Sequence, residues 1–129
     1  MTAAFLYAAL VTLLYLVLTF RTIVLRGRLR VALGDGNDKA LQRAIRAHAN
    51  LAEYAPLALL LLYMVEVAGA RPATVHALGA ALLLGRLLHA LGISRVREPL
   101  PLRMAGMVLT TGCLIVSSVI LLSSYALGI

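Results

Sequence analysis

The sequence of 129 residues (13.7 kDa) allows one domain, and 62% of its residues are hydrophobic while only 13% are charged. Soluble domains contain about 45–50% apolar residues, so the mean hydropathy of +0.96 excludes a water-soluble globule and indicates a membrane protein. The net charge of +7 does not indicate nucleic-acid binding, because the basic residues lie beside apolar segments and only 5% of the residues are aromatic.

Four apolar segments separated by turns predict four helices. The first begins with an uncharged run of about 18 residues, Ala3 to Phe20, which is close to the length that spans a membrane. The turn Gly34-Asp35-Gly36-Asn37 follows, and Asp38 is placed as the N-cap of the second helix. Pro99 and Pro101 mark a break before the last segment. The expected helices cover about residues 3–26, 38–68, 73–93 and 103–126. The sequence therefore predicts an all-α integral membrane protein whose single domain, residues 1–129, is a four-transmembrane-helix up-down bundle.

Lysine and arginine are concentrated near two of the three connections, whereas the middle connection has only Arg71. The first and third connections and their flanks contain Arg21, Arg26, Arg28, Arg30, Lys39, Arg43, Arg95, Arg97 and Arg103. The positive-inside rule places these two connections in the cytoplasm and both termini outside. Taken alone, the arginines at positions 26, 28 and 30 are interpreted as anchors to lipid headgroups. Glu66, beside the middle connection, is expected to extend to that membrane surface.

The second predicted helix carries a polar face that continues into its lipid-length part. At about 100° per residue, seven polar residues fall within an arc of about 120°, and His48 points nearly the opposite way. These seven residues are Lys39, Gln42, Arg43, Arg46, Asn50, Glu53 and Tyr54. An arginine or carboxylate near the bilayer centre costs about 2.5–3.5 kcal/mol. Such a face is therefore expected to contact protein or a water-filled pocket, and we interpret it as the wall of a binding site.

The third and fourth helices supply further polar groups that can converge with this face. Arg86 and His89 lie on one side of the third helix, and Arg103 begins the fourth at a similar level. One interpretation is a set of interhelical ion pairs, for example Glu53 with Arg86, that fixes helix packing. Alternatively, the excess of cations over carboxylates indicates an anionic ligand. The sequence has no Gly-rich phosphate loop, zinc-ligand spacing, serine-nucleophile motif or haem motif, so a nucleophile is expected to come with a bound cofactor.

The string Arg-Ala-His-x-Asn-x-x-Glu-Tyr-x-Pro, here Arg46 to Pro56, resembles the signature of the MAPEG family. These are the membrane-associated proteins of eicosanoid and glutathione metabolism. The turn at 34–36 and the segments 85–92 and 102–106 are similar to the small bacterial members. The resemblance covers nearly the whole chain. It implies a four-helix protomer in a homotrimer of the bacterial inner membrane, with glutathione bound between neighbouring protomers at the cytoplasmic side.

The resemblance also implies roles for individual residues. Arg103 matches the arginine credited with activating the thiol, which is the catalytic role, and no metal is implied. His48 matches a position that can serve the neighbouring protomer's site, in agreement with its place on the opposite face of the helix. The positions matched to cofactor binding are Arg26, Arg46, His48, Asn50, Glu53, Tyr54, Arg86 and His89. Of these, Arg26 resembles an arginine that reaches across the subunit boundary.

Two departures from the family pattern narrow the expected activity. Ile93 stands where prostaglandin- and leukotriene-forming members have a tyrosine, and Met104 stands where the prostaglandin E synthase has a serine, so eicosanoid synthesis is not supported. The expected activity is that of a glutathione-dependent transferase or peroxidase acting on hydrophobic electrophiles or lipid hydroperoxides. Arginines bind the carboxylates of glutathione through charge-assisted hydrogen bonds, and a cation near the sulfur favours the nucleophilic thiolate.

Two other classes of protein are alternatives. A non-enzymatic lipid-binding or scaffold protein of the same fold would keep the lipid cleft without thiol chemistry, and Arg103 argues against it. A small drug exporter needs a carboxylate in its first helix, and none lies between Met1 and Arg21. The expected partners are membrane lipid, a hydrophobic small-molecule substrate and further copies of the chain, but not nucleic acid. The sequence leaves open whether glutathione or another thiol is the native cofactor.

Overall fold

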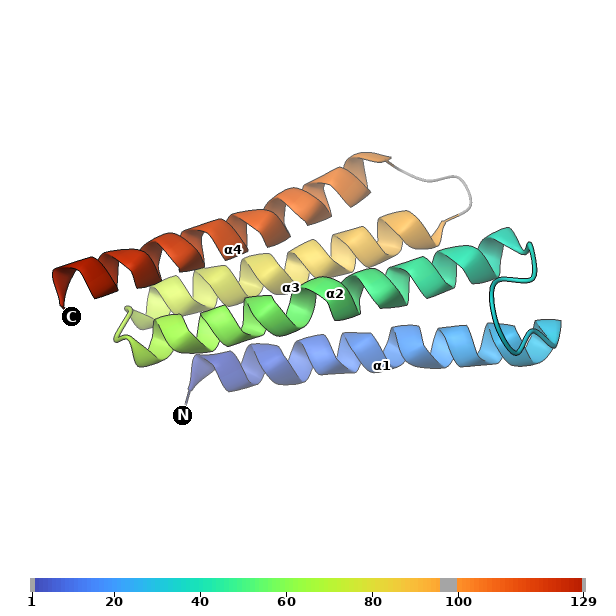
Figure 1. Ribbon diagram of the computed structural model, residues 1–129, viewed down its shortest axis with the longest axis horizontal. Helices are drawn as coiled ribbons and strands as arrows, with labels where there is room; N and C mark the ends of the chain where they lie inside the picture. Colours follow the sequence, from blue (N-terminus) through green and yellow to red (C-terminus); the bar gives the residue numbers. More distant parts are fainter. Residues whose placement is uncertain (1, 96–99, 129) are drawn as a thin grey trace.

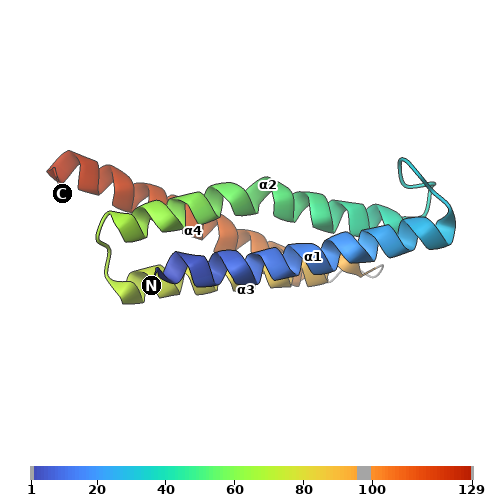
Figure 2. The ribbon, with the colours of Figure 1, turned by 90° about the horizontal axis from the view of Figure 1, so that it is seen from below.

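The computed structural model describes residues 2–95 and 100–128, in which four long helices run alternately up and down. Their bounds are α1 Ala3–Leu29, α2 Lys39–Val67, α3 Pro72–Ser94 and α4 Leu100–Leu127. Both chain termini lie at the same end of the bundle, together with the short connection between α2 and α3 (Figures 1 and 2). The sequence positions Arg97 and Pro99 fall outside the described residues.

Each of the four helices is long and apolar enough to cross a membrane. They contain 23 to 29 residues, and about 20 residues of helix span the hydrocarbon core of a bilayer. The expected all-helical, four-span architecture is therefore confirmed, and the most apolar part of α3 is 50% buried, against 22–28% for the other helices. α2 and α3 each pack against all three other helices, and α3 is the more deeply buried of the two.

Two helix boundaries differ from those expected. α1 continues to Leu29, because Gly27 does not interrupt it and Arg30 ends it in a left-handed conformation, with φ 54°. The backbone N–H of Arg30 bonds to the carbonyl oxygens of Arg26 and Gly27, which satisfies the helix end. α4 already begins at Leu100, and Pro101 lies in its first turn, where the missing N–H of proline removes no helical bond.

The contact between α3 and α4 is close enough to bring their backbones together. A Cβ atom built on Gly106 would lie 2.5 Å from the carbonyl oxygen of Gly85 and 2.6 Å from the backbone nitrogen of His89. A Cβ atom built on Gly85 would lie 2.9 Å from the carbonyl oxygen of Gly106. Only glycine fits at these two positions, and the close approach places the following residues of α3 directly against α4.

Glu66, in the last turn of α2 beside the middle connection, caps the N-terminus of α1. Its two carboxylate oxygens accept hydrogen bonds from the backbone nitrogens of Ala3 and Ala4, at 2.6 and 2.8 Å. Thr2, the N-cap residue of α1, makes no side-chain cap bond. The first N–H groups of a helix have no partner within it and carry partial positive charge, so a half-buried carboxylate from α2 stabilises this end.

Replacement of Glu66 by alanine is therefore expected to lower the free energy of unfolding by about 1–2 kcal/mol, the usual value of a helix cap. Thermal unfolding in detergent, followed by far-ultraviolet circular dichroism, measures this loss. Glu66→Gln keeps one acceptor oxygen without the charge, so its midpoint should lie between those of the native protein and Glu66→Ala. Equal midpoints for all three proteins would show that the cap contributes nothing.

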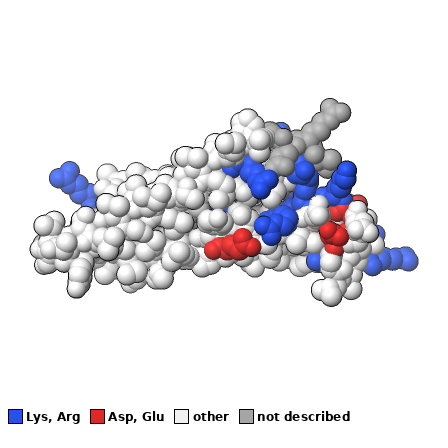
Figure 3. Space-filling view, turned by 45° about the horizontal axis from the view of Figure 1, so that its top comes forward, with Lys and Arg blue, Asp and Glu red and all other residues white. Residues whose placement is uncertain are grey.

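Most charged side chains lie toward the end of the bundle opposite the termini, here called the basic end (Figure 3), whereas Glu66 and Arg71 lie at the other end, beside the α2–α3 connection. The basic end contains the connection between α1 and α2, the last turns of α3 and the first turn of α4. Its described basic residues are Arg21, Arg26, Arg28, Arg30, Lys39, Arg43, Arg46, Arg95 and Arg103. Asp38 caps α2 here as predicted, because its side chain accepts a hydrogen bond of 2.8 Å from the backbone nitrogen of Leu41.

Candidate functional site

The polar face of α2 lies beside the buried face of that helix. Buried residues recur every three or four positions, and they are Leu41, Ala44, Ala47, Leu51, Ala55, Ala58, Leu62 and Val65. This spacing leaves Arg46 and Glu53 exposed, whereas Asn50 and Tyr54 are half-buried at the edge toward α3 and α4. The charged residues of this face are therefore exposed, and its neutral polar residues lie nearer the interior of the bundle.

Arg86 of α3 is the centre of the buried polar cluster, with only 1% of its surface exposed. Its Nη1 donates a hydrogen bond of 2.8 Å to Oδ1 of Asn50, and its Nε donates one of 2.9 Å to Oγ1 of Thr110. Its Nη2 lies 3.4 Å from Sδ of Met107, and its guanidinium carbon is 5.3 Å from the ring centroid of Tyr54. Arg86 thus joins α2, α3 and α4 at one point.

The interhelical ion pair between Glu53 and Arg86, one of the two interpretations of the sequence, does not form. Arg86 bonds to Asn50 instead, and within residues 2–95 and 100–128 no hydrogen bond or ion pair joins Glu53 to an arginine. Burial explains the difference, because Asn50 is half-buried and Glu53 is exposed. The carboxylate of Glu53 therefore remains available on the surface of α2.

His89 and Arg103 lie where α3 meets the beginning of α4. His89 is 3% exposed, and the absence of a Cβ on Gly106 lets α4 lie against it. About one helical turn farther along α3, Gly92 also allows α4 to approach closely, because a Cβ atom there would lie 2.9 Å from the backbone nitrogen of Arg103. Gly92 and Gly106 therefore determine how Arg103 is placed along α3 relative to His89.

Arg103 forms part of the wall of an apolar groove on α4. The groove has a volume of about 430 Å³, and its described lining consists of Leu100, Arg103, Met104, Met107 and Val108. Met104 and Val108 are 59% and 67% exposed, as expected for side chains that face lipid. Met107 also contacts the guanidinium of Arg86, so the groove and the buried polar cluster are adjacent. The arrangement brings a cation to the edge of a site that an oily molecule can enter.

Arg26 and Arg46 share a second groove at the basic end, with a volume of about 280 Å³. Its other described lining residues are Gly34, Asp35, Gln42 and Ile45. Arg26 folds back on the α1–α2 connection, and its Nη1 donates to the carbonyl oxygen of Gly34 at 2.9 Å. Arg46 is exposed and forms no hydrogen bond with any described residue. An anion in this groove would meet both guanidinium groups.

His48 lies apart from the other candidate residues, on the face of α2 that packs against α1. Its ring centroid is 4.6 Å from that of Tyr15, and its Nε2 is buried without a hydrogen-bond partner among the described residues. The opposite orientation expected for His48 is therefore observed. Contact of this ring with a ligand would require it to leave Tyr15.

Two neutral residues of α4, Thr110 and Met107, contact Arg86 but were not predicted from the sequence. Thr110 is fully buried, accepts the bond from Arg86 and donates one of 2.9 Å to the carbonyl oxygen of Gly106. The available signal was the lone arginine in an otherwise apolar helix, since a buried guanidinium requires acceptors on its neighbours. Nothing in the pattern of α4, however, distinguishes Thr110 from Thr111, which bonds to its own helix at the Met107 carbonyl oxygen.

Two arginines that we placed near the basic end are engaged with the carboxyl end of α3. Arg21 donates to the hydroxyl of Ser94 and, at 3.2 Å, to its carbonyl oxygen. Nη1 of Arg43 donates to the carbonyl oxygen of Ile93 at 3.3 Å. Cations stabilise the C-terminus of a helix, where carbonyl groups are unpaired. Part of the cationic excess therefore has a structural role.

Comparison with known proteins agrees with this arrangement. The model of the MAPEG family matches residues 4–123. The chain is 46% identical over 87 residues to the inner membrane protein YecN of Escherichia coli strain K12, and equally to its counterpart in Escherichia coli O6:H1 strain CFT073. The matched segment covers 67% of this chain and 66% of each relative, slightly under two thirds of the relative's length.

Proposed function

We propose that this chain, which belongs to the MAPEG family, is a glutathione-dependent transferase or peroxidase that acts on hydrophobic electrophiles or lipid hydroperoxides in the membrane. The observation that carries the proposal is the position of Arg103 in the wall of the apolar groove of α4, next to the buried cluster of Arg86, Asn50 and Tyr54. An oily substrate and an anionic thiol can meet at this edge.

The side chains match the chemistry of a tripeptide with two carboxylates and one ammonium group. Arg46 and Arg26, which share the groove of about 280 Å³, bind a carboxylate. Glu53 is exposed on the same helix as Arg46 and accepts from the ammonium group. Asn50 and Tyr54, which contact Arg86, offer neutral hydrogen-bonding groups, and His89 of α3 lies buried where α3 meets α4.

Glutathione supplies the nucleophilic sulfur. Arg103 holds that sulfur as the thiolate, since a nearby cation favours the charged form. In conjugation a carbon–sulfur bond forms while the leaving group departs from the electrophile. In peroxide reduction two thiols are oxidised to a disulfide while the hydroperoxide is reduced to an alcohol and water. Either kind of substrate reaches the thiolate from the membrane through the lipid-exposed groove of α4.

The proposed setting is a bacterial inner membrane, with the basic end in the cytoplasm and both termini outside. The positive-inside rule supports this orientation, and the related YecN proteins are inner membrane proteins. Reduced thiols are abundant in the cytosol, where the basic end would face them. We further propose that the chain assembles as a homotrimer in which the groove of α4 meets a neighbouring protomer, whose residues complete the glutathione site.

Titration of the detergent-purified protein with glutathione tests the proposal. The ultraviolet difference spectrum should show saturable thiolate absorbance at neutral pH. S-methylglutathione keeps both carboxylates but has no ionisable thiol, so it should compete for the site without producing the band. A panel of hydrophobic electrophiles and a lipid hydroperoxide then identifies the reaction. If glutathione neither binds nor ionises, the proposed function is wrong.

A non-enzymatic lipid-binding or scaffold role is the alternative. A third groove, with a volume of about 390 Å³ between α1 and α2, favours it because its lining is almost entirely apolar. The lining residues are Val11, Thr12, Tyr15, Leu51, Ala52, Ala55, Pro56 and Leu59. Binding of a fatty acid without any thiolate signal in the same titration would favour this alternative.

A further inference from the structure

A fourth groove follows the last turns of α1 at the basic end and lies apart from the residues assigned to glutathione. Its volume is about 370 Å³, and Ala40 of α2 closes one side. The remaining described lining consists of Phe20, Arg21, Val24, Leu25 and Arg28, all from α1. The groove therefore combines an apolar wall with two guanidinium groups, and no carboxylate belongs to its described lining.

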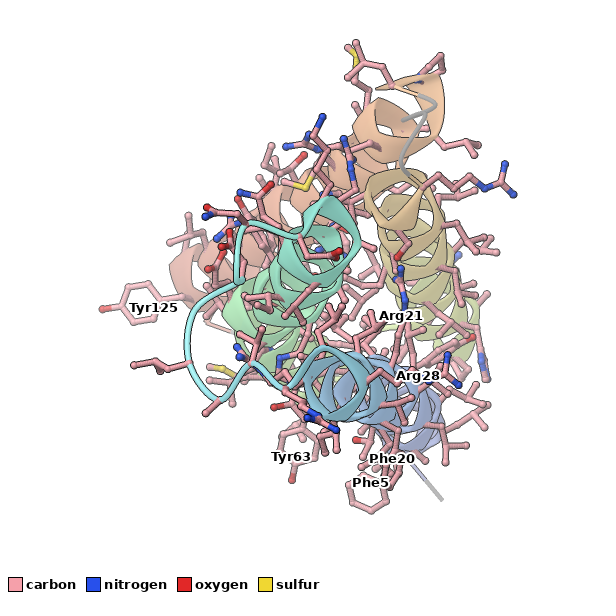
Figure 4. The ribbon with its side chains drawn as sticks, turned by 90° about the vertical axis from the view of Figure 1, so that its right-hand side faces the viewer. Phe5, Phe20, Arg21, Arg28, Tyr63 and Tyr125 are labelled. Carbon is pink, nitrogen blue, oxygen red and sulfur yellow. The ribbon has the colours of Figure 1, made fainter. Side chains whose placement is uncertain are left out.

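The two arginines lie on one side of α1. They are seven residues apart, which is about two helical turns and about 10 Å along the axis. Figure 4, which looks onto the basic end, shows Arg21 directed toward α3 and Arg28 on the same side of α1. Arg21 is fixed by its bonds to Ser94, yet a guanidinium has more N–H donors than these bonds use. Arg28 is exposed, and helical side chains lean toward the N-terminus, here toward Arg21.

The groove lies at the boundary between hydrocarbon and headgroups. The uncharged run of α1 ends at Phe20, and about 20 residues of helix span the hydrocarbon core. Arg21 therefore lies at the level of the lipid phosphates, with Arg28 beyond it. On the lipid side of this level, Val17 and Phe20 are 63% and 62% exposed, and Val24, which lies between the two arginines, is 48% exposed. Val17 and Phe20 therefore offer a surface for an acyl chain on the hydrocarbon side of the two arginines.

We propose that this groove is a binding site for an anionic phospholipid. The phosphate lies between Arg21 and Arg28, beside Val24, and one acyl chain follows Phe20 and Val17 toward the hydrocarbon. Basic pockets between transmembrane helices bind anionic headgroups in this way, and charge complementarity favours an anionic over a zwitterionic lipid. The apolar wall favours a lipid over a free phosphate, because a soluble anion would gain nothing from it. None of these residues is among those assigned to glutathione, so the site is independent of the proposed function.

Native mass spectrometry of the detergent-purified protein, titrated with phosphatidylglycerol or phosphatidylcholine of identical acyl chains, tests the site. The native protein should bind phosphatidylglycerol more tightly. Arg28→Ala should weaken this binding about fivefold, the factor that corresponds to about 1 kcal/mol for one basic residue at a membrane surface. Ala40→Phe keeps every charge but fills the groove, so it should weaken binding at least as much.

Arg30→Asn is the matched control. Arg30 belongs to the same basic end but not to the groove, and asparagine tolerates its left-handed conformation. Its affinity for phosphatidylglycerol should stay within about twofold of the native value. Equal losses of phosphatidylglycerol affinity in Arg28→Ala and Arg30→Asn would mean that the lipid is attracted by the general positive charge of the basic end, and would overturn the site. Equal affinity of the native protein for phosphatidylglycerol and phosphatidylcholine would also overturn it. Displacement of phosphatidylglycerol by an equal concentration of glycerol 3-phosphate would identify a free-anion site and overturn the lipid assignment.

Discussion

Arg103→Ala is expected to lower kcat/KM for glutathione conjugation to a model electrophile by at least about 100-fold, the usual cost of removing a group that stabilises a reacting anion. The backbone of α4 at position 103 packs against Gly92, and substitution by alanine does not change that backbone, so the helix packing should be retained. The thiolate absorbance should disappear at neutral pH and return only when the pH is raised toward the pKa of a free thiol, about 8.5.

Two further variants separate this role from a general effect of charge. Arg103→Lys keeps a cation at the groove and should recover part of the thiolate signal, although an ammonium group is not planar and bonds less specifically. Arg95→Ala removes an exposed arginine of the same basic end and should leave activity within about twofold. Native activity in Arg103→Ala would refute the assignment of Arg103, even if glutathione still binds.

The wall of the groove explains why the substrate is expected to be apolar. Met104 follows Arg103 and is 59% exposed, so it extends the apolar surface and offers no hydroxyl group to a reacting oxygen. Leu100 and Val108, exposed by 55% and 67%, continue that surface along α4. Burial of apolar surface contributes about 25 cal/mol per Å², so an oily electrophile gains affinity from the same groove that brings it to the cation.

The fold was predictable because its signals are strong and local. Four apolar segments of spanning length and a helix periodicity in α2 were enough to predict four helices and to place His48 opposite the polar face. The partners of buried polar groups were not predictable in the same way. Angular position on α2 does not tell whether Asn50 or Glu53 is the deeper residue, and depth decides which of them bonds to Arg86.

The cationic excess was also only partly interpretable from the sequence. Arg21 and Arg43 bond to the carboxyl end of α3, and Arg26 bonds to carbonyl oxygens of the α1–α2 connection. A sequence shows these charges but not the helix end that uses them, because the α3 terminus is distant in the chain. Arg46, exposed and without a hydrogen bond to any described residue, best represents the charge that a ligand would neutralise.

Arg86→Met is expected to leave the fold intact while raising the dissociation constant for glutathione by about 10-fold, which is about 1.4 kcal/mol. A guanidinium in the middle of a membrane helix costs about 2.5–3.5 kcal/mol, and an apolar residue of similar length often restores that loss. The thermal midpoint in detergent should therefore fall little or even rise. Binding should weaken because Asn50 loses the donor that orients its amide at 2.8 Å, while Tyr54 loses the cation near its ring.

A double-mutant cycle distinguishes this positioning role from simple packing. Asn50→Ala should weaken glutathione binding to a similar extent as Arg86→Met, and the double variant should be little worse than either, because both changes remove the same oriented amide. Thr110→Val removes the other strong acceptor of Arg86 and leaves α2 unchanged. It should weaken glutathione binding less than Asn50→Ala does, but lower the thermal midpoint more, since it leaves Nε of Arg86 unpaired. Strictly additive losses for Arg86→Met and Asn50→Ala would mean that Arg86 does not act through Asn50. Arg86 is buried in a membrane helix at an energetic cost, and one of its donors is fixed on Asn50 beside the α4 groove. Binding of a ligand by the amide of Asn50 best explains why an arginine occupies this position.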